Sequence, residues 1–132
     1  MGKSASGKDH IYARLAAHEG LGLKKLVLYT TRPIRAEEEN GKQYYFVDDK
    51  KLEEFRSSGN LIEARAYHTV HGIWNYFTAD DGQVDLKNSD YLGIGTLESY
   101  VKMREYYGKE NVCPVYIEVE DGERILCRYT LK

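Results

Sequence analysis

The sequence is poor in cysteine and proline and has no long hydrophobic run. Only two cysteines, Cys113 and Cys127, and two prolines occur among its 132 residues. Two cysteines without a Cys-x-x-Cys motif exclude the disulfide framework of a small secreted domain, so we expect reduced thiols and a cytoplasmic protein. No apolar stretch reaches the ~18 residues that cross a membrane, and no signal-peptide pattern follows Met1. We therefore expect no membrane partner.

The sequence also lacks an excess of positive charge. Lysine and arginine total 19 against 21 aspartates and glutamates, a net charge of -2, which argues against a nucleic-acid partner. The hydrophobic content of 42% and charged content of 30% are ordinary for a globular protein, and the length suits one domain over residues 1–132. Tyrosine is unusually frequent, with 12 residues. We expect most of them to be half-buried with the hydroxyl in water.

The most informative stretch is Thr30–Val47. Arg32 and Arg35 flank Pro33, which favours an extended loop over a helix, and Asn40-Gly41 then predicts a turn before a strand. Two guanidinium groups in one loop can bind a phosphate group bidentately. The alternative is a solvated basic loop without a ligand.

A second phosphate motif lies at Gly2–Asp9. Its spacing, Gly-x-x-x-x-Gly-Lys, is that of a P-loop, in which backbone amides surround nucleotide phosphates and the lysine bridges them. Gly7 permits close backbone approach, and Lys8 lies at the start of a predicted helix, where anions are favoured. The residues predicted to bind ATP are Gly2, Lys3, Ser4, Ala5, Ser6, Gly7, Lys8, Asp9 and His10.

Residues 30–47 resemble the nucleoside-monophosphate loop of guanylate kinases, which has Thr-Thr-Arg, then Pro-x-Arg, then Glu-x-x-Gly-x-x-Tyr-x-Phe-Val. The P-loop lies at the matching distance upstream. The resemblance is clear over residues 2–15 and 26–63 and thinner beyond. It implies ATP-dependent phosphorylation of a nucleoside monophosphate, most simply GMP or dGMP, with Mg²⁺ as cofactor.

The resemblance also implies roles for individual residues. It assigns the acceptor nucleotide to Arg32, Arg35, Glu38, Tyr44, Glu63 and Tyr76. It assigns the phosphates in transfer to Lys8, Arg32, Arg35, Arg124 and Arg128. In this scheme Glu38 orders the loop and Glu63 accepts the N–H edge of guanine. The alternatives are an exposed strand glutamate for Glu63 and a solvated helix face for Arg124 and Arg128.

The chain departs from the family pattern in three places. Asp9 replaces the usual hydroxyl residue after the lysine; its carboxylate could bind Mg²⁺. Leu28 stands where the family has a serine that contacts guanine, and residues 93–98 lack the family's acidic segment. These losses predict weaker discrimination between bases.

Two other functions are consistent with these departures. One is a guanylate-kinase-like interaction module without turnover, and the other is a kinase for a non-nucleotide phosphate. His68 and His71 have no third metal ligand nearby in the sequence, so we do not expect a metal site there. Trp74 either stacks on a base or, as we favour, packs in the protein.

The local patterns predict helices over residues 8–19 and 97–107 and one capped by Asp48 or Asp49 and closed by Gly59. They predict strands at residues 26–29, 44–47, 60–67, 72–78, 91–96 and 112–119. Residues after Asp121 suit a helix or the return arm of a hairpin, and the resemblance favours the helix. The predicted class is α/β: a P-loop parallel sheet flanked by helices, with a small mixed β/α acceptor-binding insertion at residues 31–78.

The position of the P-loop at the start of the sequence leads to one further expectation. A P-loop normally follows a buried strand, and the family's lid and C-terminal part have no counterpart here. We therefore expect one of two outcomes for the slot between the strands at Leu26 and Tyr91. Either another chain segment or a second subunit in a homo-oligomer fills it, or the protein begins some residues upstream and residues 1–8 are poorly ordered. We also expect little kinase activity from these 132 residues alone.

Overall fold

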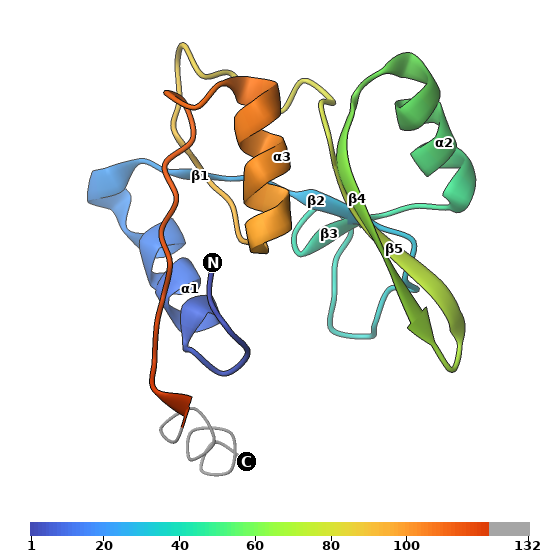
Figure 1. The fold of residues 1–132 in the computed structure, drawn as a ribbon, viewed down its shortest axis with the longest axis horizontal. Helices are drawn as coiled ribbons and strands as arrows, with labels where there is room; N and C mark the ends of the chain where they lie inside the picture. The colour runs from blue at the N-terminus through green and yellow to red at the C-terminus, as the bar shows by residue number, and fades with distance from the viewer. Residues whose placement is uncertain (122–132) are drawn as a thin grey trace. The chain divides into compact units, whose positions relative to one another are not determined.

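The computed structural model describes residues 1–121, in which groups of strands lie between helices along the chain (Figure 1). In chain order the elements are α1 Lys8–Ala17, the 3-10 helix η1 Glu19–Leu21, β1 Lys24–Lys25, β2 Leu28–Thr30, β3 Tyr44–Phe46, α2 Asp49–Ser58, β4 Leu61–Thr69, β5 Gly72–Ala79, β6 Tyr91–Leu92 and α3 Leu97–Tyr107. The predicted α/β class is confirmed. The chain divides into two compact units, which we call the sheet unit, Leu26–Asn88, and the terminal unit, Met1–Lys25 with the chain from Ser89 onward.

The sheet unit is built on four strands in the order β3-β2-β5-β4. β2 and β3 are parallel, whereas β5 is antiparallel to both of its neighbours, so the sheet is mixed. β4 and β5 form the long hairpin on the right of Figure 1, and α2 lies beside it. The predicted strands at residues 44–47, 60–67 and 72–78 are therefore confirmed, and the hairpin is longer than predicted at its tip.

One face of this sheet, together with α2, makes the hydrophobic core. Tyr29 of β2 stacks on Phe77 of β5 at 5.1 Å between ring centroids, and Phe55 of α2 meets the Tyr29 ring edge-on at 5.1 Å. Leu52 of α2 completes the buried cluster with Ala79. Because side chains alternate along a strand, packing these residues on one face leaves the opposite face free for polar groups.

Helix α2 shows how local signals determine an element. The Asp48 carboxylate accepts a hydrogen bond from the Lys51 amide at 3.0 Å, which satisfies one of the helix's unpaired N-terminal donors. Gly59 ends the helix in the left-handed conformation, with φ of 77°, where an L side chain would be strained. The predicted cap and stop of this helix are confirmed.

A β-bulge interrupts β4 near its start. Leu61 pairs with Ala79, but the next registered pair joins Glu63 to Thr78, so Ile62 is the extra residue. Without the bulge, Glu63 would share a face with Leu61, which packs against the core. The bulge therefore turns Glu63 to the polar face of the sheet, a re-aiming that bulges commonly perform.

In the terminal unit, β1 and β6 pair in parallel over two residues each, and α1 packs against β6. Helix α3 begins at Leu97, as predicted, and the hydroxyl of its N-cap residue, Thr96, accepts a hydrogen bond from the Ser99 amide at 3.2 Å. The chain after α3 runs past α1 to the N-terminus (Figure 1). There the Ile117 amide donates to Met1 O at 2.8 Å.

Several predictions for the terminal unit are wrong. The strand predicted at residues 91–96 is two residues long, and that predicted at 112–119 is reduced to a single bridge between Ile117 and Gly2. A strand needs a partner along its length, and within residues 1–121 this segment pairs only with the first two residues. On α3, Leu97 is 66% exposed and Val101 is 42% exposed, so neither side chain packs in a core.

The predicted slot is absent from the described residues. Lys24 lies directly opposite Tyr91 and Lys25 opposite Leu92, so the two strands that we expected to be separated are neighbours. No space remains between them for a further segment or a second subunit. The alternative helix or hairpin after Asp121 lies outside the described residues.

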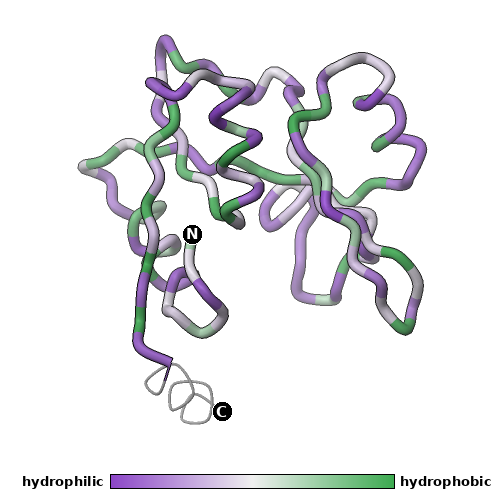
Figure 2. The backbone as a smooth tube through the Cα atoms, in the orientation of Figure 1, coloured by the Kyte–Doolittle hydropathy of each residue, from purple (hydrophilic) through white to green (hydrophobic). Residues whose placement is uncertain are grey.

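Hydrophilic and hydrophobic stretches alternate along the chain (Figure 2). Within residues 1–121, no helix has the length and apolar character that crossing a membrane requires.

Candidate functional site

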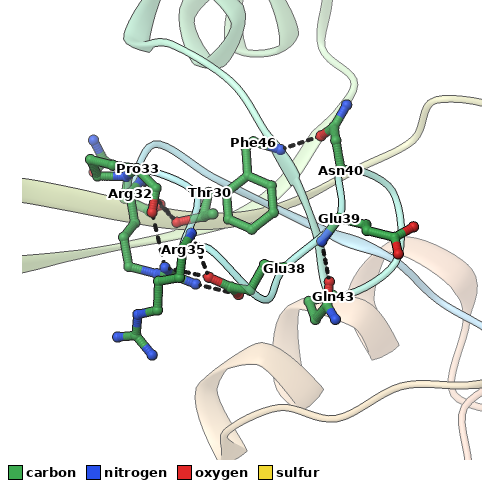
Figure 3. Close-up of polar contacts among 10 residues, drawn as sticks. Thr30, Arg32, Pro33, Arg35, Glu38, Glu39, Asn40, Gln43 and Phe46 are labelled. Carbon is green, nitrogen blue, oxygen red and sulfur yellow. Dashed lines mark hydrogen bonds and ion pairs between the residues drawn. The ribbon is translucent and has the colours of Figure 1, made fainter.

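The loop between β2 and β3 is organised by Glu38. Its carboxylate accepts two hydrogen bonds from the Arg32 guanidinium, each at 2.8 Å, in a bidentate ion pair (Figure 3). The same carboxylate accepts the Arg35 amide at 3.0 Å. Arg32 also donates to Pro33 O at 3.0 Å. One carboxylate thereby fixes both ends of the Arg32–Arg35 segment, the role that the resemblance implied for Glu38.

Burial and charge make this ion pair strong. Arg32 is only 5% exposed, although it lies in a loop. Hydrogen bonding to Glu38 is the main cause that raises the pKa of Arg32, with a smaller contribution from Tyr76. In return, Arg32 is the main cause that lowers the pKa of Glu38. Both groups stay charged near neutral pH, so the loop keeps a preformed positive centre.

Aromatic rings surround the Arg32 guanidinium. Its central carbon lies 5.4 Å from the centroid of the Phe46 ring and 5.9 Å from that of Tyr44, within cation–π range. Tyr44 in turn meets Tyr76 edge-on at 5.5 Å. Burial is the main cause that raises the pKa of Tyr44, so its hydroxyl remains a hydrogen-bond donor at neutral pH. The structure thus brings together three predicted acceptor residues.

Arg35 differs from Arg32. Its side chain is exposed, and its guanidinium makes no hydrogen bond or ion pair with any residue from 1 to 121. Figure 3 shows the Arg32 and Arg35 side chains extending downward from the loop in that view, with the Arg35 guanidinium below that of Arg32 and directed away from the Glu38 carboxylate. Arg35 therefore offers all five of its N–H donors to a ligand.

Glu63 is buried rather than exposed, so the alternative interpretation of an exposed strand glutamate is wrong. Its side chain is 3% exposed. Oε1 accepts the Thr78 hydroxyl at 2.9 Å, and Oε2 accepts the Arg65 Nε–H at 3.1 Å. The buried carboxylate therefore has a donor on each of its two oxygens.

These residues share the face of the sheet opposite the core. The register pairs Glu63 with Thr78 and Arg65 with Tyr76. Tyr76 pairs in turn with Thr30 of β2, and Thr30 pairs with Phe46 of β3. Since paired residues point to the same side, the polar face crosses all four strands, from Tyr44 and Phe46 at one edge to Glu63, Arg65 and Tyr67 at the other.

The sequence analysis missed two members of this face, Arg65 and Thr78. The spacing of Glu63 and Arg65, two apart in a predicted strand, already indicates that their opposite charges share a face. Thr78 has no such local signal, because its place beside Glu63 depends on the hairpin register and on the bulge.

In the terminal unit, residues 2–7 form a tight loop before α1. A Cβ on Gly2 would lie 2.6 Å from Ser6 Oγ and 2.8 Å from Ile117 O, so no side chain fits there. Ser6 is buried, and its Oγ has no hydrogen-bond partner in the part of the chain that the structure describes. Ala5 and Gly7 both have left-handed φ values, 59° and 78°. Left-handed residues of this kind also occur in anion-binding nests, although the Ser6 amide here donates to Lys3 O at 3.2 Å.

Helix α1 adds donors to this loop. Gly7 caps the helix without a side-chain hydrogen bond, and the first bond is donated by Ile11 to Gly7 O at 3.1 Å. The amides of Lys8, Asp9 and His10 therefore have no partner within the helix. Together with the orphaned Ser6 hydroxyl, these donors fit the phosphates of a nucleotide.

Asp9 lies exposed in the first turn of α1. Mg²⁺ is held in nucleotide sites by one or two carboxylates, with phosphate oxygens and water supplying the other ligands, so a single carboxylate beside a phosphate loop fits the ion. No cluster of three or more His, Cys, Asp or Glu side chains that could hold a metal occurs among residues 1–121. His71 instead stacks against Trp74, at 6.3 Å and 14°. Arg124 and Arg128 lie outside the described residues.

Comparison with known proteins agrees with this arrangement. The sequence model of the guanylate kinase family matches residues 1–74, which is more than half of the chain. The chain belongs to the guanylate kinase family. The matched part contains the glycine-rich loop, the arginine loop and the strand that bears Glu63.

Individual proteins with similar sequences are named guanylate kinase. The guanylate kinase of Anaplasma phagocytophilum is 34% identical over 128 residues, which cover 94% of this chain and 59% of the relative. That of Wolbachia pipientis wMel is 37% identical over 71 residues, 53% of this chain and 35% of the relative. The chain thus spans about one third to three fifths of the length of these relatives.

A solved structure extends the likeness to the fold. The crystal structure of guanylate kinase from Anaplasma phagocytophilum matches with a TM-score of 0.62 and covers 97% of this chain and 62% of that one. The identity in this match is 24%, so it supports the fold alone.

Proposed function

We propose that this chain is part of an ATP-dependent nucleoside-monophosphate kinase whose acceptor is GMP or dGMP. The polar face of the sheet unit is the acceptor site, and the loop at residues 2–10 binds the phosphates of ATP. Family membership supports the reaction class, and the arrangement of the polar face supports the acceptor site.

The proposed reaction transfers the terminal phosphoryl group of ATP to a phosphate oxygen of the nucleoside monophosphate. The P–O bond to ADP breaks as the bond to the acceptor oxygen forms, which yields ADP and the nucleoside diphosphate. The acceptor phosphate is largely dianionic at neutral pH and needs no general base. Bound Mg²⁺ supplies neutralisation of the triphosphate charge. The protein's part is positioning and further neutralisation of charge.

The observation that carries the proposal is that the two arginines of the loop differ, since Arg32 is buried and paired whereas Arg35 is exposed and unpaired within residues 1–121. Arg32 is locked against Glu38 and the rings of Tyr44 and Phe46, and it supplies a fixed positive centre. Arg35 leaves its guanidinium unpaired and exposed beside that centre. A dianionic phosphate satisfies Arg35 bidentately and receives the hydroxyls of Tyr44 and Tyr76. The Arg35 backbone amide is fixed by Glu38, but its guanidinium contributes no contact to the loop itself. This arrangement favours a role for the guanidinium in binding a ligand.

Lys8 and the amides at the start of α1 hold the donor. The lysine ammonium makes no hydrogen bond or ion pair with residues 1–121, so it is available to bridge phosphate groups. Asp9 is the proposed Mg²⁺ ligand in this loop. For Arg124 and Arg128, contact with the phosphates in transfer remains a proposal that rests on the resemblance.

The test is a turnover assay that measures both products, ADP and the nucleoside diphosphate. The chain is incubated with ATP, Mg²⁺ and, in separate reactions, GMP, dGMP, AMP, CMP and UMP, and ADP and nucleoside diphosphate are quantified together. The proposal predicts equal amounts of ADP and GDP, with GMP or dGMP preferred. Lys8→Ala should abolish turnover while GMP binding persists. Because we expect little turnover from these 132 residues alone, the same reactions are also run on the chain joined to the lid and C-terminal part of a guanylate kinase relative. If GMP binds but neither protein phosphorylates any nucleoside monophosphate at any ATP concentration, the kinase proposal fails.

Two observations favour a second candidate, an interaction module without turnover. Asp9 adds a negative charge where the nucleotide's phosphates would lie, and Leu28 places an apolar side chain opposite Tyr44 on the polar face. Such a module would use the Arg35 face to bind a phosphorylated partner. Binding of a phosphopeptide in competition with GMP, without turnover of any nucleotide, would favour it.

A further inference from the structure

The pairing of Glu63 raises a difficulty for recognition of guanine. The resemblance has this carboxylate accept the N–H edge of the base, yet both of its oxygens already have donors, Thr78 on Oε1 and Arg65 on Oε2. A carboxylate has about four lone-pair sites, so two remain. The question is which polar groups at this end of the face an incoming base meets first.

The accessible charged group next to Glu63 at that end is the guanidinium of Arg65. Its Nε–H is used on Glu63, while its two terminal nitrogens make no hydrogen bond to residues 1–121 and are not among the buried unpartnered atoms. The side chain is 15% exposed, against 3% for Glu63 behind it. A ligand that reaches this end therefore meets N–H donors and must present an acceptor to them.

The position of Arg65 relative to the loop supports a role in the site. Arg65 lies opposite Tyr76 in the β4–β5 ladder, and Tyr76 contacts Tyr44 edge-on. The positive charges of Arg65 and Arg32 both act on the Tyr44 hydroxyl. Tyr44 thus lies between two ion pairs, Arg32–Glu38 at the proposed phosphate end and Glu63–Arg65 at the other. A nucleotide bound through its phosphate at the first would reach the second with its base.

We propose that Arg65 is the specificity-determining residue of the acceptor site, donating to the 6-oxo group of a purine while Glu63 accepts the neighbouring N–H. An arginine and a glutamate side by side offer a donor next to an acceptor. This pattern complements an oxo group next to N1–H, as in guanine. Adenine has the reverse order, a 6-amino donor next to an unprotonated N1. Its amino group would therefore meet the Arg65 donors, and its N1 would meet the Glu63 acceptor. Arg65 thereby supplies a base contact on a face where Leu28 can supply none.

This inference rests on the proposed function, because it requires a nucleoside monophosphate in the polar face. Its test measures affinity by calorimetry on the 132-residue chain, without ATP, for GMP, 6-thio-GMP and ribose 5-phosphate. The 6-thio analogue keeps N1–H and the 2-amino group for Glu63 and replaces only the oxo acceptor by sulfur, a weak acceptor. Ribose 5-phosphate keeps the phosphate and lacks the base.

The unmodified chain should bind GMP about tenfold or more tightly than 6-thio-GMP, as expected for loss of a hydrogen bond to a charged donor. In Arg65→Met the two should bind equally, and ribose 5-phosphate should bind as it does to the unmodified chain. The matched control is Arg56→Met on α2, which removes an exposed arginine paired with Glu53 and should leave all three affinities unchanged.

Three results would overturn the inference while leaving the proposed function standing. GMP could bind more tightly to Arg65→Met, which would make Arg65 a competitor for Glu63. GMP and ribose 5-phosphate could weaken equally in that variant, which would make its role structural. The unmodified chain could also bind GMP and 6-thio-GMP alike, a comparison that decides the matter even if Arg65→Met fails to fold. Binding of none of the three ligands would overturn the inference and the acceptor site together.

Discussion

The two units of this chain differ in how they hold their candidate sites. In the sheet unit a four-stranded sheet and α2 enclose a core, and two ion pairs lie buried on the opposite face. The terminal unit has two-residue strands, and within residues 1–121 its only buried side chains are those of Ser6 and Ser99. The proposed acceptor residues are therefore preformed by packing, whereas the proposed phosphate loop depends on backbone turns and helix donors. Where apolar area is buried, site geometry is stable without ligand.

The largest effect that would test this contrast is a core truncation. Phe77 is 0% exposed, so Phe77→Ala should lower the free energy of unfolding by about 3–5 kcal/mol through lost burial and a cavity. The matched change in the terminal unit, Leu97→Ala, should stay within about 0.5 kcal/mol because Leu97 is largely exposed. Urea unfolding followed by the fluorescence of Trp74, the single tryptophan, which lies in the sheet unit, measures the first variant, and urea unfolding followed by the backbone amide NMR signals of α3 measures the second. Similar losses for the two variants would mean that the terminal unit has a core of its own.

The next effect concerns the unpaired arginine. Arg35→Ala should weaken GMP binding about ten- to a hundredfold, because it removes charge-assisted hydrogen bonds to the phosphate. The urea midpoint should not change, because the side chain is exposed and makes no hydrogen bond or ion pair with the described residues. Calorimetry with GMP gives the first quantity and Trp74 fluorescence the second. A variant that binds GMP normally would show that the loop is merely a solvated basic segment.

Two glycines in the same conformation offer a smaller, matched comparison. Gly59 ends α2 and Gly7 begins α1, with φ of 77° and 78° and open space at both Cβ positions. Alanine costs roughly 1–2 kcal/mol in this left-handed region. Gly59→Ala should therefore shift the Trp74-detected unfolding by about that amount, whereas Gly7→Ala should leave it unchanged and weaken ATP binding. If Gly59→Ala and Gly7→Ala lower the Trp74-detected free energy of unfolding equally, the two units are not independently stable.

The last prediction concerns how the stability of the protein changes in acid. Glu38 has its pKa lowered from 4.5 by Arg32, so its contribution to stability is complete above pH 4.5 and is lost as pH falls through the lower, folded-state value. The unmodified chain should therefore be more stable than Glu38→Gln near neutral pH, and the difference should shrink below pH 4.5. Urea midpoints from neutral pH into acid measure it. A constant difference over that range would mean that the ion pair does not titrate with folding.

The elements best predicted from the sequence are those with local signals. Asp48 and Gly59 bound α2 as expected, and Thr96 begins α3, because a cap and a stop act within a few residues. The strand predicted at residues 112–119 failed because a strand depends on a partner that its own sequence does not specify.

For the candidate site, the arginine loop was predictable and the base end was not. Arg32, Arg35 and Glu38 lie within seven residues of one another, so their spacing already indicates one loop. The burial of Glu63 and its contact with Thr78 follow from a one-residue bulge at Ile62, which changes which face a side chain takes. No property of Ile62 itself marks that bulge in the sequence.

The central claim is that the sheet unit holds a preformed phosphate site, and NMR titration tests it most directly. The chain is titrated with GMP and, separately, with guanosine, while arginine Nε–H and backbone amide signals are followed. Our account predicts saturable shifts at Arg32, Arg35 and Tyr44 with GMP and none there with guanosine, because the phosphate provides the binding contacts. Equal shifts with the two ligands, or GMP-induced shifts that leave these residues unchanged, would contradict it.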